Sequence, residues 1–226
     1  MAKLTTGNPT SPFDGLQQKM KDVDRLLEIH KELTGTGYLR PKAAVLYKSG
    51  VVLITACWEA FIEDVVTKAL DFIVTNIPAQ EKLPKELRKI VAQHLKNDKH
   101  ELSVWTLAGE KWKNRATDIL KEPVDQFHVP THGNIDKLFK KVINLKEVSE
   151  KWYWPGMSKE RTRKKLNDYI DIRHDIAHKS TTDAEVLRWN VEEYSNHVCR
   201  IAKITCNTTR DYVHEITNEY PWDETQ

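Results

Sequence analysis

Residues that interrupt secondary structure are scarce in this sequence, with 8 glycines and 9 prolines among 226 residues. No stretch alternates polar and apolar residues as a half-buried strand does, and no segment repeats. The strongest apolar run, residues 51–58, lies between Lys48 and Glu59 and is far too short to cross a bilayer. These absences exclude β-sheet and repeat folds, and we expect no contact with a membrane.

Cysteine is also rare, at Cys57, Cys199 and Cys206, with no CxxC pair and no zinc-finger spacing. An odd number in a chain of this size argues against a disulfide framework, so we interpret the three as core side chains in a cytoplasmic, reducing location. The first 14 residues have no apolar stretch of the secretory type. The formal net charge is only +2, so charge alone does not require a polyanionic partner.

What is present is helical periodicity: apolar residues recur at steps of three and four. Glycines after residue 34, Pro41 in a first turn, and a capping box formed by Thr182 and Glu185 mark helix ends. Asn134 is expected to cap a short helix. The other expected helices are residues 14–34, 41–76, 84–97, 103–121, 158–178 and 182–218. The fold class is therefore all-α, an up-and-down helical bundle around the apolar helix 41–76.

The expected domain organisation is a single helical domain. It spans residues 14–218, with a flexible leader at 1–13 and a C-terminal tail at 219–226. Residues 77–121 are expected to form a helical insertion in the middle of the bundle.

The chemistry concentrates near the end of helix 158–178. Arg173 and His178 are five residues apart, about 7.5 Å along the axis, and His174 stacks four residues before His178. Metal-independent RNA cleavage needs a base for the 2′-OH, an acid for the 5′-oxygen, and a cation for the phosphorane. Histidine can move either proton, and arginine can hold two phosphate oxygens. One Arg and one His do not fill all three roles, but a two-fold dimer supplies two of each.

The spacing by itself is weak evidence, because roughly 0.4 such Arg-to-His pairs are expected by chance in this composition. One alternative is structural: His178 bonds a terminal carbonyl and Arg173 pairs with a carboxylate. Another is a metal site made by the two histidines with Asp171 or Asp175. Arg173 beside a metal would be repelled and no further ligand is near, so we expect no metal and no cofactor.

Three segments resemble the HEPN superfamily, in its RiboL-PSP-HEPN branch. Arg173-His174-x3-His178 resembles the Arg-x4–6-His motif of HEPN domains. Residues 127–139, FHVPTHGNIDKLF, resemble the Phe-x-x-Pro-x-x-x-Asn-Ile-x-x-Leu-Phe segment of that branch. Residues 51–63, VVLITACWEAFIE, resemble its early helix, which has an acidic residue after a hydrophobic run. The segments follow the family order.

The resemblance implies a helical bundle, homodimerisation around a composite cleft, and a metal-independent endoribonuclease in host defence or a toxin–antitoxin setting. By position Arg173 binds phosphate and His178 is catalytic. The expected substrate is single-stranded or looped RNA, tRNA included, cut to 2′,3′-cyclic phosphate and 5′-OH ends. An antitoxin or sensor protein stays open as a partner. The alternative is a non-catalytic helical module that binds RNA, a nucleotide or a protein.

Supporting residues are proposed on two helices. Glu59 can fix the Arg173 guanidinium, or be an exposed charge. His174 can bind substrate or orient His178, or be solvated. Asp175 can hydrogen-bond either histidine, or form a surface ion pair with Lys179, four residues on. His128 and His132 lie in a loop where solvation is the ordinary state. A basic run before Arg173 can guide RNA beside the aromatic residues 152–154, although such runs are usually solvated faces. Its members are Lys159, Arg161, Arg163, Lys164 and Lys165.

Overall fold

The computed structural model describes residues 10–34, 40–179 and 186–226. The described segments contain α-helices, short 3-10 helices (η) and one isolated bridge between Trp154 and Met157, which confirms the all-α prediction. In chain order the elements are α1 (Pro12–Thr34), α2 (Arg40–Asn76), η1 (Gln80–Lys82), α3 (Lys85–Lys96), η2 (Glu101–Leu107), α4 (Lys111–Asp125), α5 (His132–Val142), η3 (Val148–Lys151), α6 (Lys159–Lys179) and α7 (Arg188–Thr217).

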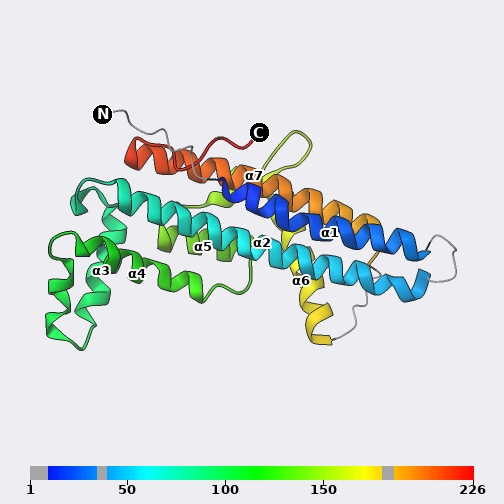
Figure 1. Ribbon diagram of the computed structural model, residues 1–226, viewed down its shortest axis with the longest axis horizontal. Coiled ribbons are helices and arrows are strands. Elements are labelled where there is room, and N and C mark those ends of the chain that lie inside the picture. The colour runs from blue at the N-terminus through cyan, green and yellow to red at the C-terminus, as the bar shows by residue number, and fades with distance from the viewer. Residues whose placement is uncertain (1–9, 35–39, 180–185) are drawn as a thin grey trace.

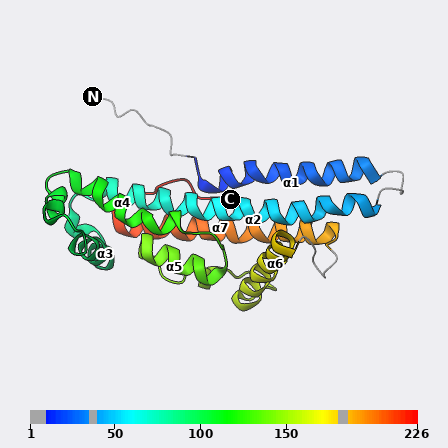
Figure 2. The same cartoon turned by 90° about the horizontal axis from the view of Figure 1, so that it is seen from below.

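The bundle is built around α2, which runs along the long axis with α1 and α7 beside it (Figures 1 and 2). Its buried residues recur every three or four positions, and Trp58 and Phe61 stack at 5.6 Å within them. The helix is apolar because neighbours cover it on several sides. α5 and α6 lie on the side of α2 opposite α1 (Figure 2), and the C-terminal end of α6 extends away from the bundle (Figure 1).

One helix of the described chain is long and apolar enough to cross a membrane by length and composition: the Val45–Asn76 part of α2. The apolar stretch is thus longer than residues 51–58. Half of its most hydrophobic window is buried inside the protein, as in the core helix of a bundle. The absence of membrane contact stays a prediction.

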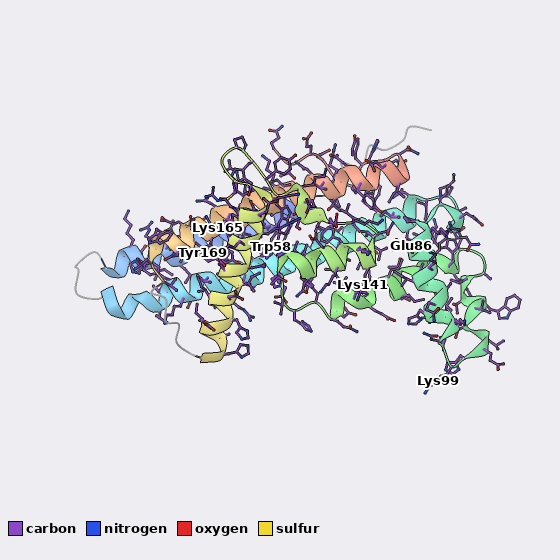
Figure 3. All side chains as sticks on the ribbon, turned by 180° about the vertical axis from the view of Figure 1, so that it is seen from behind. Trp58, Glu86, Lys99, Lys141, Lys165 and Tyr169 are labelled. Atoms are coloured by element: carbon purple, nitrogen blue, oxygen red, sulfur yellow. The ribbon has the colours of Figure 1, made fainter. Side chains whose placement is uncertain are left out.

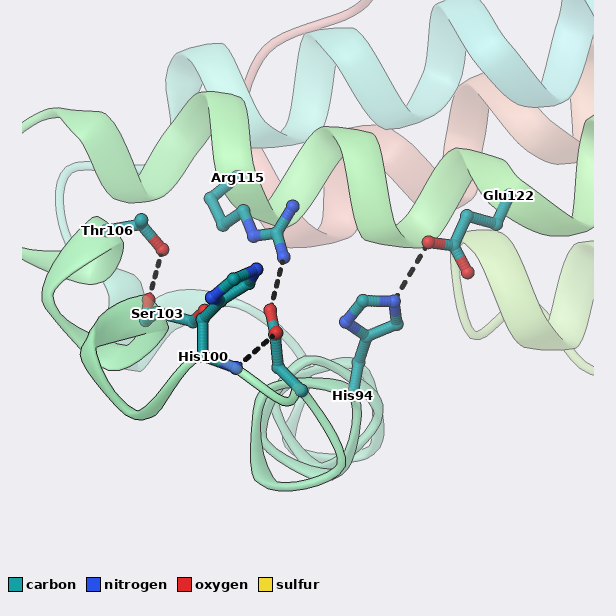
Figure 4. A network of polar contacts seen from close by, with 7 residues as sticks. His94, His100, Ser103, Thr106, Arg115 and Glu122 are labelled. Atoms are coloured by element: carbon teal, nitrogen blue, oxygen red, sulfur yellow. Dashed lines mark hydrogen bonds and ion pairs between the residues drawn. The ribbon is translucent and has the colours of Figure 1, made fainter.

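Residues 77–125 pack at one end of the bundle as η1, α3, η2 and α4. The expected helix 103–121 is wrong, because Glu101–Leu107 forms a 3-10 helix and Gly109 turns the chain at φ +60°. α4 starts at Lys111 and contains Pro123 in its last turn. Two polar contacts hold the unit together (Figure 4): His94 meets Glu122 at 2.9 Å, and Arg115 meets Asp98 at 3.4 Å.

The ends of the domain differ in detail from expectation. α1 begins two residues early, and Phe13 within the expected leader is buried. In the tail, Trp222 is buried, and the Thr225 amide donates to Asn207 Oδ1 at 3.0 Å. The expected capping box at 182–185 lies outside the described residues. Asn134 does not cap α5, because its side-chain amide donates to the Val129 carbonyl at 3.0 Å inside a helix that begins at His132.

Candidate active site

The register of α6 sets the direction of Arg173. Leu166, Tyr169 and Ile170 are buried, and Arg173 is seven residues after Leu166 on the same stripe. Its side chain is accordingly half-buried against the bundle. His174 and His178 are exposed, with ring centroids 4.4 Å apart. α6 therefore presents a guanidinium toward the core and two imidazoles at the protruding end of the helix.

α2 meets α6 and α7 along one row of side chains four residues apart: Thr55, Glu59 and Glu63. Thr55 Oγ1 lies 3.0 Å from the hydroxyl of Tyr194, a buried α7 residue. Tyr194 stacks on Tyr169 of α6 at 4.2 Å. This row therefore follows the junction between α2, α6 and α7.

Glu59 is the next member of the row. Burial raises the pKa of the Glu59 carboxyl, and Glu63 adds to this, while Arg173 and His128 act in the opposite direction. The Arg173 charge also acts on Tyr194, against the effect of burial on the pKa of that tyrosine. Arg173 thus lies near both Glu59 and Tyr194. No hydrogen bond or ion pair joins Glu59 and Arg173 among the described residues, so the role of Glu59 in fixing the guanidinium stays a prediction.

His128 is a further member of this cluster. Burial raises the pKa of Glu63, and His128 is the largest opposing influence. The exposed His128 therefore lies near both glutamates of the row. Sequence reasoning placed His128 only in a loop beside Pro130 and missed this proximity.

Two contacts fix the loop that carries His128. The Trp58 indole donates to the Pro130 carbonyl at 3.2 Å in a buried environment. At the start of α5, the Asn167 side-chain amide donates to His132 Nδ1 at 2.9 Å, which ties the loop to α6. Trp58, Pro130 and Asn167 thus connect α2, the 127–139 segment and α6 in space.

Among the described residues, Arg173 makes no hydrogen bond or ion pair, although the Glu59 charge is near. Its five N–H donors are therefore open to a phosphate. Asp175 is half-buried beside the histidines, and the side chain of Lys179 lies outside the described part. In the same described part, no three His, Cys, Asp or Glu residues gather as they would around a metal ion.

The basic run on α6 is largely paired with carboxylates. Glu150 pairs with Lys159 and, at 2.7 Å, with Arg163. Lys164 pairs with Asp168 at 2.6 Å, and Lys165 with Glu193 at 2.7 Å. Within the described chain the Arg161 guanidinium donates only to the Gly156 carbonyl, at 3.4 Å. These ion pairs reduce the positive charge that the run presents to solvent, and its role in guiding RNA stays a prediction.

The three aromatic residues 152–154, which precede the basic run, differ in how far they are buried. Trp152 is fully buried and donates to Thr205 at 2.9 Å, so it anchors the loop. Tyr153 is 60% exposed and is the one of the three that is open to a base. Trp154 is half-buried, with the Arg200 guanidinium 5.0 Å from its ring centroid.

An all-α bundle with an Arg-x4-His motif on a protruding helix defines a HEPN-type domain. The family model for RiboL-PSP-HEPN matches residues 18–210, so the chain belongs to this family. No curated protein and no solved structure matches it. Membership indicates an RNase-like or RNA-binding module.

Proposed function

We propose that the protein is a metal-independent endoribonuclease whose active site contains Arg173 and His178. The observation that carries the proposal is the half-buried Arg173, which has Glu59 beside it but no ion-pair partner among the described residues. A guanidinium placed in this way can bind a scissile phosphate through two parallel hydrogen bonds. The nearby carboxylate favours a positive charge at this position and leaves the guanidinium donors free for the phosphate.

His178 supplies the proton transfer in this proposal. It is exposed one turn beyond His174, at the end of α6 that extends into solvent. An imidazole there takes the proton of the 2′-OH or protonates the departing 5′-oxygen. In-line attack of the 2′-oxygen on phosphorus breaks the bond to the 5′-oxygen. The products carry 2′,3′-cyclic phosphate and 5′-OH ends.

A second copy of the chain completes the site in this proposal. One His178 does not act as base and acid in the same step, whereas a two-fold dimer through α6 brings two Arg173 and two His178 together. The protruding α6 makes such an approach sterically simple (Figure 1). On dilution below the dimer dissociation constant, activity per protomer falls together with the dimer fraction measured by sedimentation.

The test is a cleavage assay on total RNA in EDTA with mapping of product ends. Arg173→Ala and His178→Ala each lower the rate by about 100-fold or more. Matched controls are Arg25→Ala on α1 and His100→Ala beside η2, both exposed and remote from α6. Controls that cut like wild type, with cyclic-phosphate ends, support the proposal.

Two results contradict the proposal. Cleavage that survives His178→Ala assigns the activity elsewhere. RNA left intact by the wild type but bound saturably assigns the protein to the non-catalytic modules of the family. The setting in host defence or a toxin–antitoxin pair, and tRNA as substrate, belong to the same proposal and depend on the RNA species cut in that assay.

A further inference from the structure

A groove of about 1160 Å³ lies between α3 and the α5 region, away from Arg173 and His178. Its walls are marked by Glu86 on α3 and Lys141 on α5 (Figure 3). Six lysines line it against the single carboxylate of Glu86: Lys89, Lys96, Lys137, Lys140, Lys141 and Lys146.

These lysines differ from the α6 basic run because most have no carboxylate partner. Lys89 pairs with Glu86 at 2.9 Å. Within the described chain the other five make no ion pair, and all five are exposed. The hydrogen bond from Lys89 lowers the pKa of the Glu86 carboxyl, and the Lys146 charge acts on it across the groove in the same direction. The groove therefore carries a concentrated, unneutralised positive charge.

The lysines of α5 repel one another, which points to a ligand. Lys137 is three residues before Lys140 and four before Lys141, spacings at which like charges destabilise a helix. The helix dipole favours cations in the last turn, where Lys140 and Lys141 lie. The same effect favours Lys96 in the last turn of α3, but it does not account for Lys137 in the middle of α5 or for Lys146 beyond its end. A polyanion bound between the walls relieves the repulsion.

We propose that this groove binds the phosphate backbone of the RNA substrate, an inference that rests on the proposed endoribonuclease function. Lysine is depleted in the buried cores of protein–protein interfaces, where aromatic residues are enriched. This groove is instead rich in lysine, and His94 is the one residue with an aromatic ring among those that line it. The side-chain amides of Gln93, Asn97 and Asn144 also line it and can bind ribose hydroxyls or base edges.

The position of the groove suits an RNA that reaches the candidate active site. α3, α5 and α6 follow one another along the long axis (Figure 1). α5 forms one wall of the groove and is tied to α6 through His132 and Asn167. The α2 helix beneath them is about 55 Å long, which sets the scale of the surface. RNA held in the groove thus extends past α5 toward Arg173 and His178.

The experiment measures RNA binding in the His178→Ala background, so that RNA stays intact. Lys140→Gln with Lys141→Gln is compared with Lys21→Gln and Lys31→Gln, two exposed lysines on α1 at the opposite side of α2 (Figure 2). Fluorescence anisotropy follows a labelled single strand of about 20 nucleotides, longer than one binding site. Salt is varied from about 50 to about 200 mM.

The Lys140→Gln, Lys141→Gln variant is expected to bind the RNA about 20-fold more weakly near 100 mM salt. The slope of log K against log salt concentration is expected to fall in magnitude by about 1.4. The Lys21→Gln, Lys31→Gln variant is expected to show the same RNA affinity and salt slope as the His178→Ala protein. Circular dichroism checks helicity, which glutamine preserves. Equal affinity and slope for the two pairs overturns the inference. Loss of RNA binding from every protein, with polyglutamate bound instead, also overturns it and assigns the groove to an acidic protein.

The two proposals fail separately. If the wild type cleaves RNA while the Lys140→Gln, Lys141→Gln variant binds RNA as well as the α1 control variant, the ribonuclease proposal is supported and the groove proposal is contradicted. If the wild type cleaves no RNA but the Lys140→Gln, Lys141→Gln substitutions weaken RNA binding, the groove proposal is supported and the ribonuclease proposal is contradicted.

Discussion

The indole nitrogen of Trp58 lies 3.2 Å from the carbonyl oxygen of Pro130, 72 residues further along the chain. The bond joins the middle of α2 to the loop that presents His128. Trp58 also packs edge-on against Trp152 at 5.9 Å, where the chain turns toward α6. One buried side chain thus sets the distance between α2 and the loop, and with it the position of His128 relative to Glu59.

Trp58→Phe is expected to lower the free energy of unfolding by about 2 kcal/mol. The Pro130 carbonyl stays buried without its donor, and the smaller ring leaves a void. Urea unfolding measures the change. The control is Trp189→Phe on α7, 57% exposed, with a change within about 0.5 kcal/mol. Equal costs for the two substitutions would show that the Trp58 hydrogen bond contributes little.

Glu59→Gln is expected to separate activity from stability. The folded-state pKa of Glu59 is raised, so its ionised form is disfavoured in the fold; protonation adds stability at acid pH, and this contribution is lost as the pH rises through the folded pKa. The neutral glutamine therefore leaves stability at pH 7 unchanged or higher. Cleavage falls about tenfold, because the guanidinium of Arg173 loses its orienting charge.

Thermal unfolding and the cleavage rate are measured together on Glu59→Gln. The exposed Glu101→Gln serves as the control for loss of one carboxylate. A variant that loses stability and activity in parallel would mean that Glu59 only supports the fold.

The elements that the sequence predicts well have strong local signals. α1 and α2 begin and end within two residues of expectation, because glycines follow Thr34 and Pro41 opens α2. The prediction of a helix at 103–121 is wrong because Val104 and Trp105 mimic a helical period, although they are 57% and 70% exposed. Periodicity does not distinguish an apolar surface from a core face.

In the candidate site, too, features set by local sequence are predictable and features set by long-range contacts are not. Arg173 and His178 share one helix, so their spacing is visible in the sequence. His128 lies near Glu59 on the loop that Trp58 anchors at the Pro130 carbonyl, and that long-range contact has no local signature. The groove lysines lie on two helices distant in sequence, and each alone is typical of a solvated face.

His197 is expected to make the protein sensitive to mild acid. It is buried, its Nε2 donates to the Thr162 carbonyl at 3.1 Å, and burial lowers the pKa of the imidazole to about 4. Because the folded value is below the unfolded one, the stability from neutral His197 is complete above pH 6.5 and is lost toward pH 4. The expected loss by pH 5 is about 2 kcal/mol.

The comparison variant is His197→Gln, whose amide keeps a donor for Thr162 but does not titrate. Carboxylates with lowered pKa that His197 does not influence, such as Glu150 and Asp98, weaken both proteins in acid alike. The difference in unfolding free energy between pH 7 and pH 5 is therefore larger for the wild type. Equal losses in the two proteins would assign the acid sensitivity to the carboxylates alone.

Alanine substitutions at two helical glycines are expected to change the stability of the protein in opposite directions. A Cβ at Gly50 would lie 2.9 Å from Cγ1 of the buried Val191, where α2 and α7 approach closely. A Cβ at Gly15 on α1 has no atom within 4 Å. Gly15→Ala gains helix propensity and stabilises by about 1 kcal/mol. Gly50→Ala has the same gain but a larger overpacking cost, with a net loss of about 1 kcal/mol.

Val191→Ala tests the cause of the loss at Gly50. If contact with the valine methyl is responsible, Gly50→Ala becomes neutral or stabilising once Val191 is replaced by alanine, and the double-mutant cycle gives a coupling of about 1–2 kcal/mol. Urea unfolding of the four proteins measures it. Additive changes would place the cost of Gly50→Ala in the α2 backbone, because the contact with α7 would then contribute nothing.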